Sequence, residues 1–370
     1  MRVGLVIYGS LDTLTGGYLY DRKLAEHLAA HGDDVEVVSL PWRNYARHLS
    51  DNASRALARR LDGGRFDVLV QDELNHPSLV LTNRRLADRS ACPIVAMVHV
   101  LRVDELAESR LRPLYAATER RYLDGVDGAV FCCDATRASA ERLVGRPMRG
   151  AVAHPCADHL DEPAREAAIR GRGWRGGPLR VVSVANVVPR KGLLVLVDAL
   201  ARLPRDRWQL TVVGSLAMDR AYVRRVRRRV ARLGLQDSVR LMGAVANPDV
   251  AAHLSDSDVL VVPSSFEGLA IAYLEAMRVG LPVIASTAGG AGEVIDDGSE
   301  GWLVAPGDAQ TLASRLGRLC EDRELLARMG RAARGRAERH PRWDESLGHV
   351  RAFLRTVVSE HRPTGSEVAA

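Results

Sequence analysis

The sequence predicts an α/β protein built from two Rossmann-like domains that face each other across a cleft. Its length of 370 residues exceeds that of one ordinary domain. Short apolar runs alternate with helical patterns from one end to the other, which is typical of repeated βαβ units. These runs lack polar–apolar alternation, as expected for parallel strands that are buried on both faces.

The elements follow one another in a regular order. A helix over 18–30 comes after the first strand and has Tyr20, Leu24 and Leu28 on one face. A polar segment rich in Arg and Gly, residues 161–178, separates the two halves of the chain. The predicted strands are residues 3–8, 35–39, 68–71, 94–99 and 128–132, and then 181–185, 209–213, 239–242, 259–262 and 283–285.

Composition excludes several classes of protein. No apolar run approaches the roughly 20 residues that span a bilayer, and the N-terminus is a first strand and not a signal-peptide core. The five cysteines show no C-x-x-C spacing, so we expect reduced, mostly buried thiols. The expected compartment is the cytosol, with peripheral contact at the inner membrane face as the alternative.

The net charge of +6 favours an anionic ligand. Lysine is rare, since Lys23 and Lys191 are the only two in the chain. A basic run at 224–229 lies on a predicted helix with Tyr222, Val226 and Val230 inward, so a solvated helix face is the better interpretation. Only 5% of residues are aromatic, which argues against a nucleic-acid partner.

Two loops at predicted strand ends carry residues suited to phosphate. Residues 9–17 end in Gly16 and Gly17 and lead into a helix whose first amides could face a phosphate, although an ordinary βα turn is the better interpretation of this loop alone. Arg190 and Lys191 follow the strand 181–185, where open α/β sheets bind ligands. The cations suit a diphosphate, and a solvated Arg–Lys pair is the alternative.

A third segment, SSFEGLAIAYLEAM at 264–277, contains Glu267 and Glu275. If Gly268 begins a helix over 269–279, Leu269 shares one stripe with Tyr273 and Met277 while both carboxylates face the cleft. Carboxylates accept hydrogen bonds from sugar and ribose hydroxyls. By spacing alone, Glu275 could equally be a surface glutamate.

Together these segments resemble a known family. Thr15-Gly16-Gly17, Pro189-Arg190-Lys191-Gly192, the E-x7-E pair Glu267 and Glu275, and the loop 288–295 occur in the order found in family 4 retaining glycosyltransferases of the GT-B fold. The matches cover most of the chain. The resemblance implies an acceptor-binding domain over 1–165, a donor-binding domain over 178–340, and a C-terminal helix at 341–360 that packs back on the first domain.

The resemblance also implies roles for single residues. Arg190 and Lys191 would neutralise the donor diphosphate with help from amides at Gly16 and Gly17, and His99 would lie near the reacting sugar. On its own, His99 is more often a core or loop histidine. The other implied donor-binding residues are Glu267 for the sugar hydroxyls, Glu275 for the ribose, Gly268 and Leu269 for the phosphates, and Gly243.

The implied reaction is retaining transfer of a sugar from a UDP- or GDP-sugar to a hydroxyl by same-face attack. Neither a cofactor nor a metal is expected, because Arg and Lys replace the cation; Asp256-Ser257-Asp258 resembles a metal motif but precedes a buried strand. The acceptor, a small hydroxylated or lipid-linked molecule, is expected to contact N-terminal loops. The candidate acceptor residues are His99, Arg102, Asn75 and Tyr45.

Four other functions are alternatives at this point. An epimerase-like GT-B enzyme would use the same nucleotide-sugar site, and a lysine-dependent phosphorylase could use only Lys23 or Lys191. A non-catalytic binder would be expected to lose Glu267 or Arg190, and both are present. An NAD dehydrogenase would need the glycine fingerprint that the first loop lacks. The chain is expected to be a monomer or a homodimer.

Overall fold

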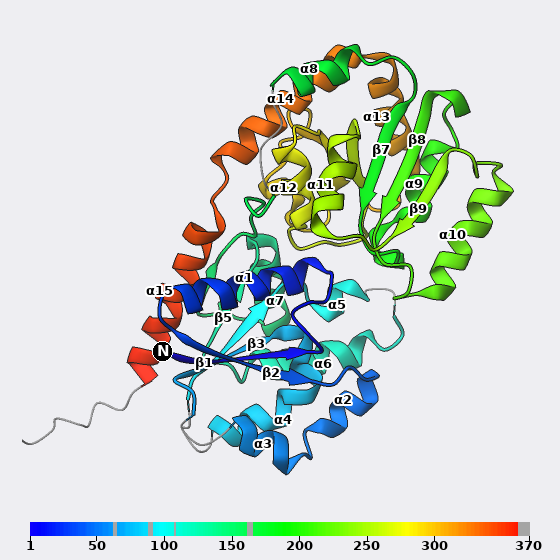
Figure 1. The fold of residues 1–370 in the computed structure, drawn as a ribbon. Coiled ribbons are helices and arrows are strands. Elements are labelled where there is room, and N and C mark those ends of the chain that lie inside the picture. The colour runs from blue at the N-terminus through cyan, green and yellow to red at the C-terminus, as the bar shows by residue number, and fades with distance from the viewer. Residues whose placement is uncertain (62–64, 88–91, 107–108, 161–165, 362–370) are drawn as a thin grey trace, which may run out of the picture. The chain divides into compact units, whose positions relative to one another are not determined.

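The computed structural model describes residues 1–61, 65–87, 92–106, 109–160 and 166–361. Two compact units divide the chain: unit 1 is Met1–Pro155 with Trp343–Ala370, and unit 2 is Cys156–Arg342. Each unit contains one six-stranded sheet whose paired strands are parallel, with helices packed around it (Figure 1). The predicted α/β class with two Rossmann-like halves is confirmed.

The sheet of unit 1 has the strand order β2-β1-β3-β4-β5-β6. Its strands are β1 Arg2–Tyr8, β2 Asp34–Leu40, β3 Val68–Asp72, β4 Ile94–Val98, β5 Gly128–Phe131 and β6 Gly150–Val152. Its helices are α1 Gly16–Ala30, α2 Tyr45–Asp51, α3 Arg55–Leu61, α4 His76–Ala87, α5 Arg102–Glu105, α6 Arg112–Leu123, α7 Asp134–Val144 and α15 Trp343–His361, with a 3-10 turn η1 at Glu73–Asn75. The order in which successive strands are added to the sheet reverses between β1 and β3. Parallel sheets bind ligands at such a switch point.

The sheet of unit 2 has the order β12-β11-β10-β7-β8-β9, which is the Rossmann order 3-2-1-4-5-6 written from its other edge. Its strands are β7 Leu179–Val184, β8 Trp208–Val213, β9 Val239–Gly243, β10 Val259–Val262, β11 Val283–Ser286 and β12 Gly301–Val304. Its helices are α8 Glu166–Trp174, α9 Leu193–Leu200, α10 Arg220–Arg232, α11 Asn247–Ser255, α12 Ile271–Arg278, α13 Ala309–Glu321 and α14 Arg323–Arg339, with 3-10 turns η2 Pro189–Lys191, η3 Arg205–Arg207 and η4 Gly290–Glu293. The switch point lies between β7 and β10.

Apolar burial explains why these segments form strands. The central strands β3, β4, β10 and β11 are buried along their whole length. The sequence analysis missed β6 and β12, which are 3 and 4 residues long and begin with glycine. Both lie at an edge of their sheet, and all three residues of β6 are only half-buried, so β6 leaves little apolar signal.

The polar segment at 161–178 is not a simple linker. Residues 161–165 lie outside the described part, but α8 follows at once and packs against α14 within unit 2. Arg172 is buried in α8 and donates hydrogen bonds to the carbonyl oxygens of Val279 and Gly280, at 2.7 and 3.0 Å. The division between units therefore falls before this segment, after Pro155.

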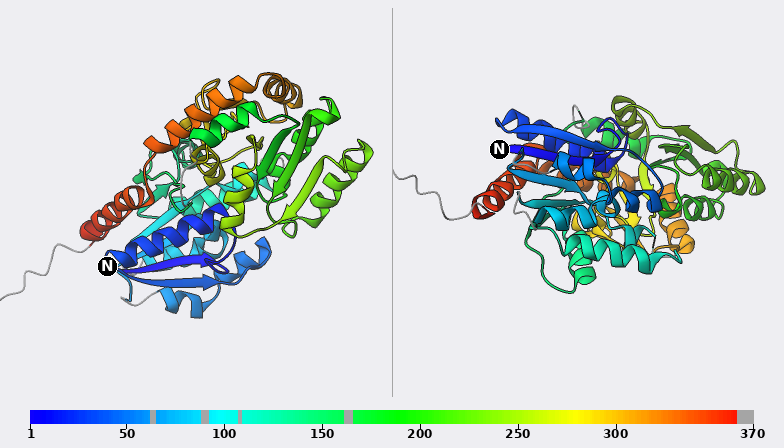
Figure 2. Two further views of the ribbon diagram at one scale, coloured as in Figure 1. Left: turned by 45° about the horizontal axis from the view of Figure 1, so that its top comes forward. Right: turned by 90° about the horizontal axis from the view of Figure 1, so that it is seen from below.

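The last helix, α15, belongs to unit 1 although it comes at the end of the chain. It lies against α1, as Figure 2 shows with α15 in red beside α1 in dark blue. The Arg351 guanidinium lies 2.6 Å from the carboxylate of Asp33, which also binds the N-terminal ammonium of Met1 at 2.7 Å. Two cations on one buried carboxylate hold the helix in place. The predicted tail after residue 362 lies outside the described residues.

Helix α10 confirms the inward face predicted from its sequence, because Tyr222, Val226 and Val230 are buried. The arginines between them are mostly exposed. No disulfide joins the five cysteines, all of which lie in described segments, and Cys132, Cys133 and Cys156 are buried. Within the described part of the chain, no helix combines the length and apolarity needed to cross a bilayer.

Candidate functional site

The strongest cluster of predicted site residues lies at the switch point of unit 2. Arg190 and Lys191 form the turn η2 that follows β7, and Glu267 lies in the loop after β10. The Arg190 guanidinium donates a hydrogen bond of 2.8 Å to Glu267 Oε2, and the Lys191 ammonium binds the same oxygen. Because β7 and β10 are neighbours, their carboxyl ends bring together residues that are 76 positions apart in the chain.

The charge of this cluster follows from its surroundings. Burial alone would raise the pKa of Glu267, but the positive charges of Arg190 and Lys191 and a hydrogen bond from Ser264 lower that pKa to about 2. Glu267 is therefore ionised at neutral pH. Arg190 and Lys191 thus meet at one ionised carboxylate at the switch point of unit 2.

Close backbone packing fixes the loop that carries Glu267. The segment predicted as the family's glycine loop lies directly against it, and Gly290 N donates to the Glu267 and Gly268 carbonyl oxygens at 3.0 and 2.8 Å. Gly289 has a φ of +110°, and a Cβ there would lie 1.6 Å from the Glu267 carbonyl oxygen. Glycine is required at this position because no side chain fits the space.

We expect Gly289→Ala to displace the Glu267 loop and to abolish ligand binding at this cluster. A matched control is Gly298→Ala, since Gly298 also has a positive φ, of +89°, but open space where the Cβ would lie. The control should cost only the roughly 1–2 kcal/mol of a left-handed backbone with a side chain. Thermal unfolding of both variants measures the difference, and equal melting temperatures would contradict the packing argument.

The helix after Glu267 begins later than predicted. Helix α12 starts at Ile271 with Ala270 as its N-cap residue, so Gly268 and Leu269 are not its first residues. The prediction that these two offer helix N-terminal amides is wrong, because the chain bridges to Gly289 at Glu267 before it turns into the helix. The predicted stripe is confirmed, since Leu269, Tyr273 and Met277 are buried.

Glu275 is not a surface residue. It lies in α12 and its Oε1 atom is 2.9 Å from Nε2 of His159, with side-chain exposures of 10% and 5%. His159 belongs to the same unit but is 116 positions away in the chain. His159 could not be predicted as a site residue, because nothing in its local sequence indicates a partner so distant.

Gly243, which was predicted to be a donor-binding residue, ends β9 with a φ of +85°. Its carbonyl oxygen accepts a hydrogen bond of 2.9 Å from Gly214 N, in the loop after β8. Gly214 in turn lies so close to β7 that a Cβ would be 2.1 Å from the Ala185 carbonyl oxygen. These glycines let three loops meet beside the switch point.

In unit 1, the predicted glycines begin α1. Thr15 is the N-cap residue and Gly16 and Gly17 are the first two helical residues, whose amides have no partner within a helix. His99 directly follows β4, and a Cβ on Gly17 would lie 3.3 Å from its ring. The Nε2 atom of His99 lies 3.0 Å from Oδ1 of Asp21, a partner that the sequence analysis did not identify.

The other candidate acceptor residues are partly structural. The Asn75 side chain is buried and donates to the Val6 carbonyl oxygen at 3.0 Å. The Tyr45 hydroxyl lies 3.0 Å from His76 Nε2. Arg102 stands over the Tyr115 ring, with its guanidinium carbon 5.9 Å from the ring centroid. All three stay candidates, and Asn75 also links β1 to the end of β3.

The carboxylate of Asp258, from the segment that resembles a metal motif, lies away from these clusters. Asp258 is fully buried, accepts a hydrogen bond of 2.9 Å from Arg180 N and pairs with Arg323 at 3.3 Å, so it anchors the start of β10.

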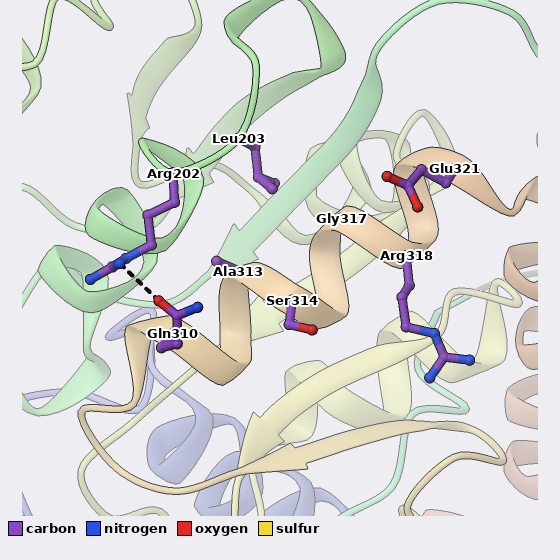
Figure 3. Close-up of a pocket in the computed structure, with 8 residues that line it drawn as sticks. All are labelled: Arg202, Leu203, Gln310, Ala313, Ser314, Gly317, Arg318 and Glu321. Carbon is purple, nitrogen blue, oxygen red and sulfur yellow. Dashed lines mark hydrogen bonds between the residues drawn. The ribbon is translucent and has the colours of Figure 1, made fainter.

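A depression of about 360 Å³ lies beside α13 and the turn after α9. Figure 3 shows its lining, in which Arg202 and Gln310 are joined by a hydrogen bond of 2.8 Å. None of the predicted site residues lines it.

Comparison with known proteins agrees with this arrangement. The family model for glycosyl transferases group 1 matches residues 164–336, and that for a glycosyl transferase 4-like domain matches residues 18–156. The chain is 31% identical over 255 residues to the GDP-mannose-dependent alpha-(1-6)-phosphatidylinositol monomannoside mannosyltransferase of Mycobacterium tuberculosis. That alignment covers 66% of this chain and 65% of the relative, so the match spans about two thirds of each protein.

Two further similarities extend over the whole chain. The phosphatidyl-myo-inositol mannosyltransferase of Mycobacterium leprae is 28% identical, with 100% of this chain and 99% of that protein covered. The sucrose-phosphate synthase of Thermosynechococcus elongatus has the same fold, with a TM-score of 0.83 at 22% identity over 97% of this chain and 100% of that one. The chain therefore belongs to the group 1 glycosyl transferases and has the GT-B fold.

Proposed function

We propose that the protein is a retaining glycosyltransferase that moves a sugar from a nucleoside-diphosphate sugar to an acceptor hydroxyl. The observation that carries the proposal is the convergence of Arg190 and Lys191 on Glu267 at the switch point of unit 2. A guanidinium fork and an ammonium in one place suit the negative charge of a diphosphate.

The donor would be held along unit 2. Glu267, ionised and fixed by its loop, accepts hydrogen bonds from sugar hydroxyls. Glu275 accepts them from the ribose, and His159 orients its carboxylate from 2.9 Å. Gly16 and Gly17 in unit 1 contribute the amides at the start of α1 to the phosphates. His99 acts near the transferred sugar.

Charge development accounts for the chemistry. Breaking the bond between sugar and diphosphate makes the sugar cationic and the leaving phosphate more negative. Arg190 and Lys191 are already in place to stabilise that negative charge, which is worth more in the transition state than in the bound donor. The acceptor hydroxyl attacks from the face that the phosphate leaves, and a phosphate oxygen takes its proton. The anomeric configuration is thereby retained without a metal or a cofactor.

The relatives narrow the choice of substrates. Both relatives above are named mannosyltransferases, one of them dependent on GDP-mannose, and both names contain a phosphatidylinositol group. We therefore propose GDP-mannose as the first donor to test and a polyhydroxylated, lipid-linked ring as the acceptor class. UDP-glucose is the second donor to test, since UDP- and GDP-sugars share the diphosphate that Arg190 and Lys191 suit.

A thermal-shift panel of GDP-mannose, GDP-glucose, UDP-glucose and UDP-galactose tests the proposal. At one hundred times the dissociation constant, the correct donor stabilises the protein by about 2.7 kcal/mol. We expect one donor to raise the melting temperature of the wild-type protein and to leave that of Arg190→Ala unchanged. If none of the four shifts the wild-type protein, the proposal fails. Proton NMR of the anomeric product then checks retention.

A further inference from the structure

Three ionisable side chains meet at the carboxyl edge of the unit 1 sheet. Asp72 is the last residue of β3, His99 directly follows the neighbouring strand β4, and Asp21 lies in α1. One nitrogen or oxygen atom from each lies within 4.8 Å of the others. The cluster is beside Gly17, at the start of the helix whose amides the proposed function uses.

Asp21 has no contact with solvent, since its exposure is 0%. Its Oδ1 atom lies 3.0 Å from His99 Nε2, while Oδ2 is buried without a hydrogen-bond partner in the described residues. A buried carboxylate costs free energy unless a positive or donating group faces it. The His99 ring is the group that the described structure places there.

The His99 ring is held by its neighbours. Gly17 lies against it so closely that a Cβ would be 3.3 Å from the ring, and the edge of the Tyr20 ring packs at a centroid distance of 5.2 Å. The Tyr20 hydroxyl is fixed by a hydrogen bond of 2.9 Å to the Ala153 carbonyl oxygen. With Nε2 committed to Asp21, Nδ1 makes no hydrogen bond among the described residues.

We propose that Asp21 is a positioning residue that holds His99 with a proton on Nε2 and keeps the imidazole cationic, so that Nδ1–H can donate to a hydroxyl of the transferred sugar. The proposal rests on the proposed function for what the Nδ1–H group binds. The protonation state proposed for the His99 ring is independent of that function. Asp21 thus acts on the sugar only through His99.

The charges facing His99 agree with this assignment. Burial lowers the pKa of His99, but Asp21, Asp72 and Glu73 together raise it above its usual value. Burial and the charge of Asp21 raise the pKa of Asp72 to about 7. The stability that the pairing of His99 with Asp21 contributes is complete below pH 6.5, the usual His pKa. It is lost as the pH rises through the raised pKa of His99.

Nitrogen NMR of ¹⁵N-histidine-labelled protein tests the state of the ring, with His99→Gln to assign its resonance. We expect wild-type His99 to titrate above pH 6.5, and Asp21→Asn to lower that midpoint by about one unit or more. The matched control is Asp33→Asn, which removes another buried unit 1 carboxylate and should leave the His99 midpoint unchanged. An unchanged midpoint in Asp21→Asn would overturn the proposal. So would Zn²⁺ at stoichiometric concentration binding the wild-type ring, since the cluster would then be a metal site.

The pH profile of kcat/KM tests the consequence for transfer. A positioning role predicts that the basic limb moves to lower pH in Asp21→Asn, together with the NMR midpoint, and moves back in Asp21→Glu. A merely structural role would lower the rate equally at every pH, and that result would also overturn the proposal. The NMR titration needs no substrate, so it gives its answer even where the proposed donor fails to bind.

Discussion

Arg190→Ala is expected to lower kcat for sugar transfer by about 100-fold to 1000-fold, the range lost when one preorganised charge stabiliser is removed from a transition state. Folding should suffer much less. The Arg190 guanidinium contacts solvent as well as the Phe266 carbonyl oxygen, at 3.1 Å, and Lys191 stays on Glu267 when Arg190 is lost. The effect on the rate should therefore exceed the effect on stability.

The matched control for this variant is Arg229→Ala. Arg229 also belongs to unit 2 and also forms an ion pair, 2.6 Å from Asp198, but it lies on α10 outside the site. Arg229→Ala should transfer sugar at the wild-type rate, because Arg229 lies outside the site. It should also fold normally, because an exposed ion pair contributes about 1 kcal/mol or less to stability. Steady-state kinetics with the donor identified by thermal shift measure both variants. Normal turnover in Arg190→Ala would remove this residue from the chemistry.

Glu267→Gln is expected to have the second largest effect, on stability as well as on transfer. The pKa of Glu267 falls from 4.5 to about 2 in the folded protein, which corresponds to about 3 kcal/mol of stabilisation at neutral pH. Because the folded pKa is the lower one, this contribution is complete above pH 4.5 and is lost as the pH falls through 2. The amide keeps the shape of the side chain but not its charge.

The difference in unfolding free energy between wild-type protein and Glu267→Gln should therefore be largest near pH 7 and should shrink as the pH is lowered toward 3. Urea unfolding at several pH values measures it. Glu275→Gln is the comparison, because Glu275 is paired with His159 and not with two fixed cations. A difference that stays constant over this pH range would mean that the charge of Glu267 does not stabilise the fold.

The cluster of Arg190, Lys191 and Glu267 could be predicted from the sequence because its residues stand at strand ends. Arg190 and Glu267 each follow a buried strand, and parallel strands deliver such residues to one edge of a sheet. Apolar runs located ten of the twelve strands for the same reason, since burial on both faces leaves a continuous signal. The two missed strands, β6 and β12, lie at sheet edges.

Contacts between residues far apart in the sequence could not be predicted in this way. His159 meets Glu275, and Asp21 meets His99, across 116 and 78 positions, and neither partner lies in a motif. The start of α12 was misplaced because the loop around Glu267 pairs with Gly289 first. Tertiary packing decides these details, and local sequence does not encode it.

Calorimetric titration with a nucleoside diphosphate and with its parent nucleoside tests the central claim most directly. If Arg190, Lys191 and Glu267 form a diphosphate site, GDP or UDP should bind the wild-type protein at least about 100-fold more tightly than guanosine or uridine, roughly 2.7 kcal/mol. Arg190→Ala should lose most of that difference. Equal affinity for nucleoside and diphosphate in the wild-type protein would contradict the account.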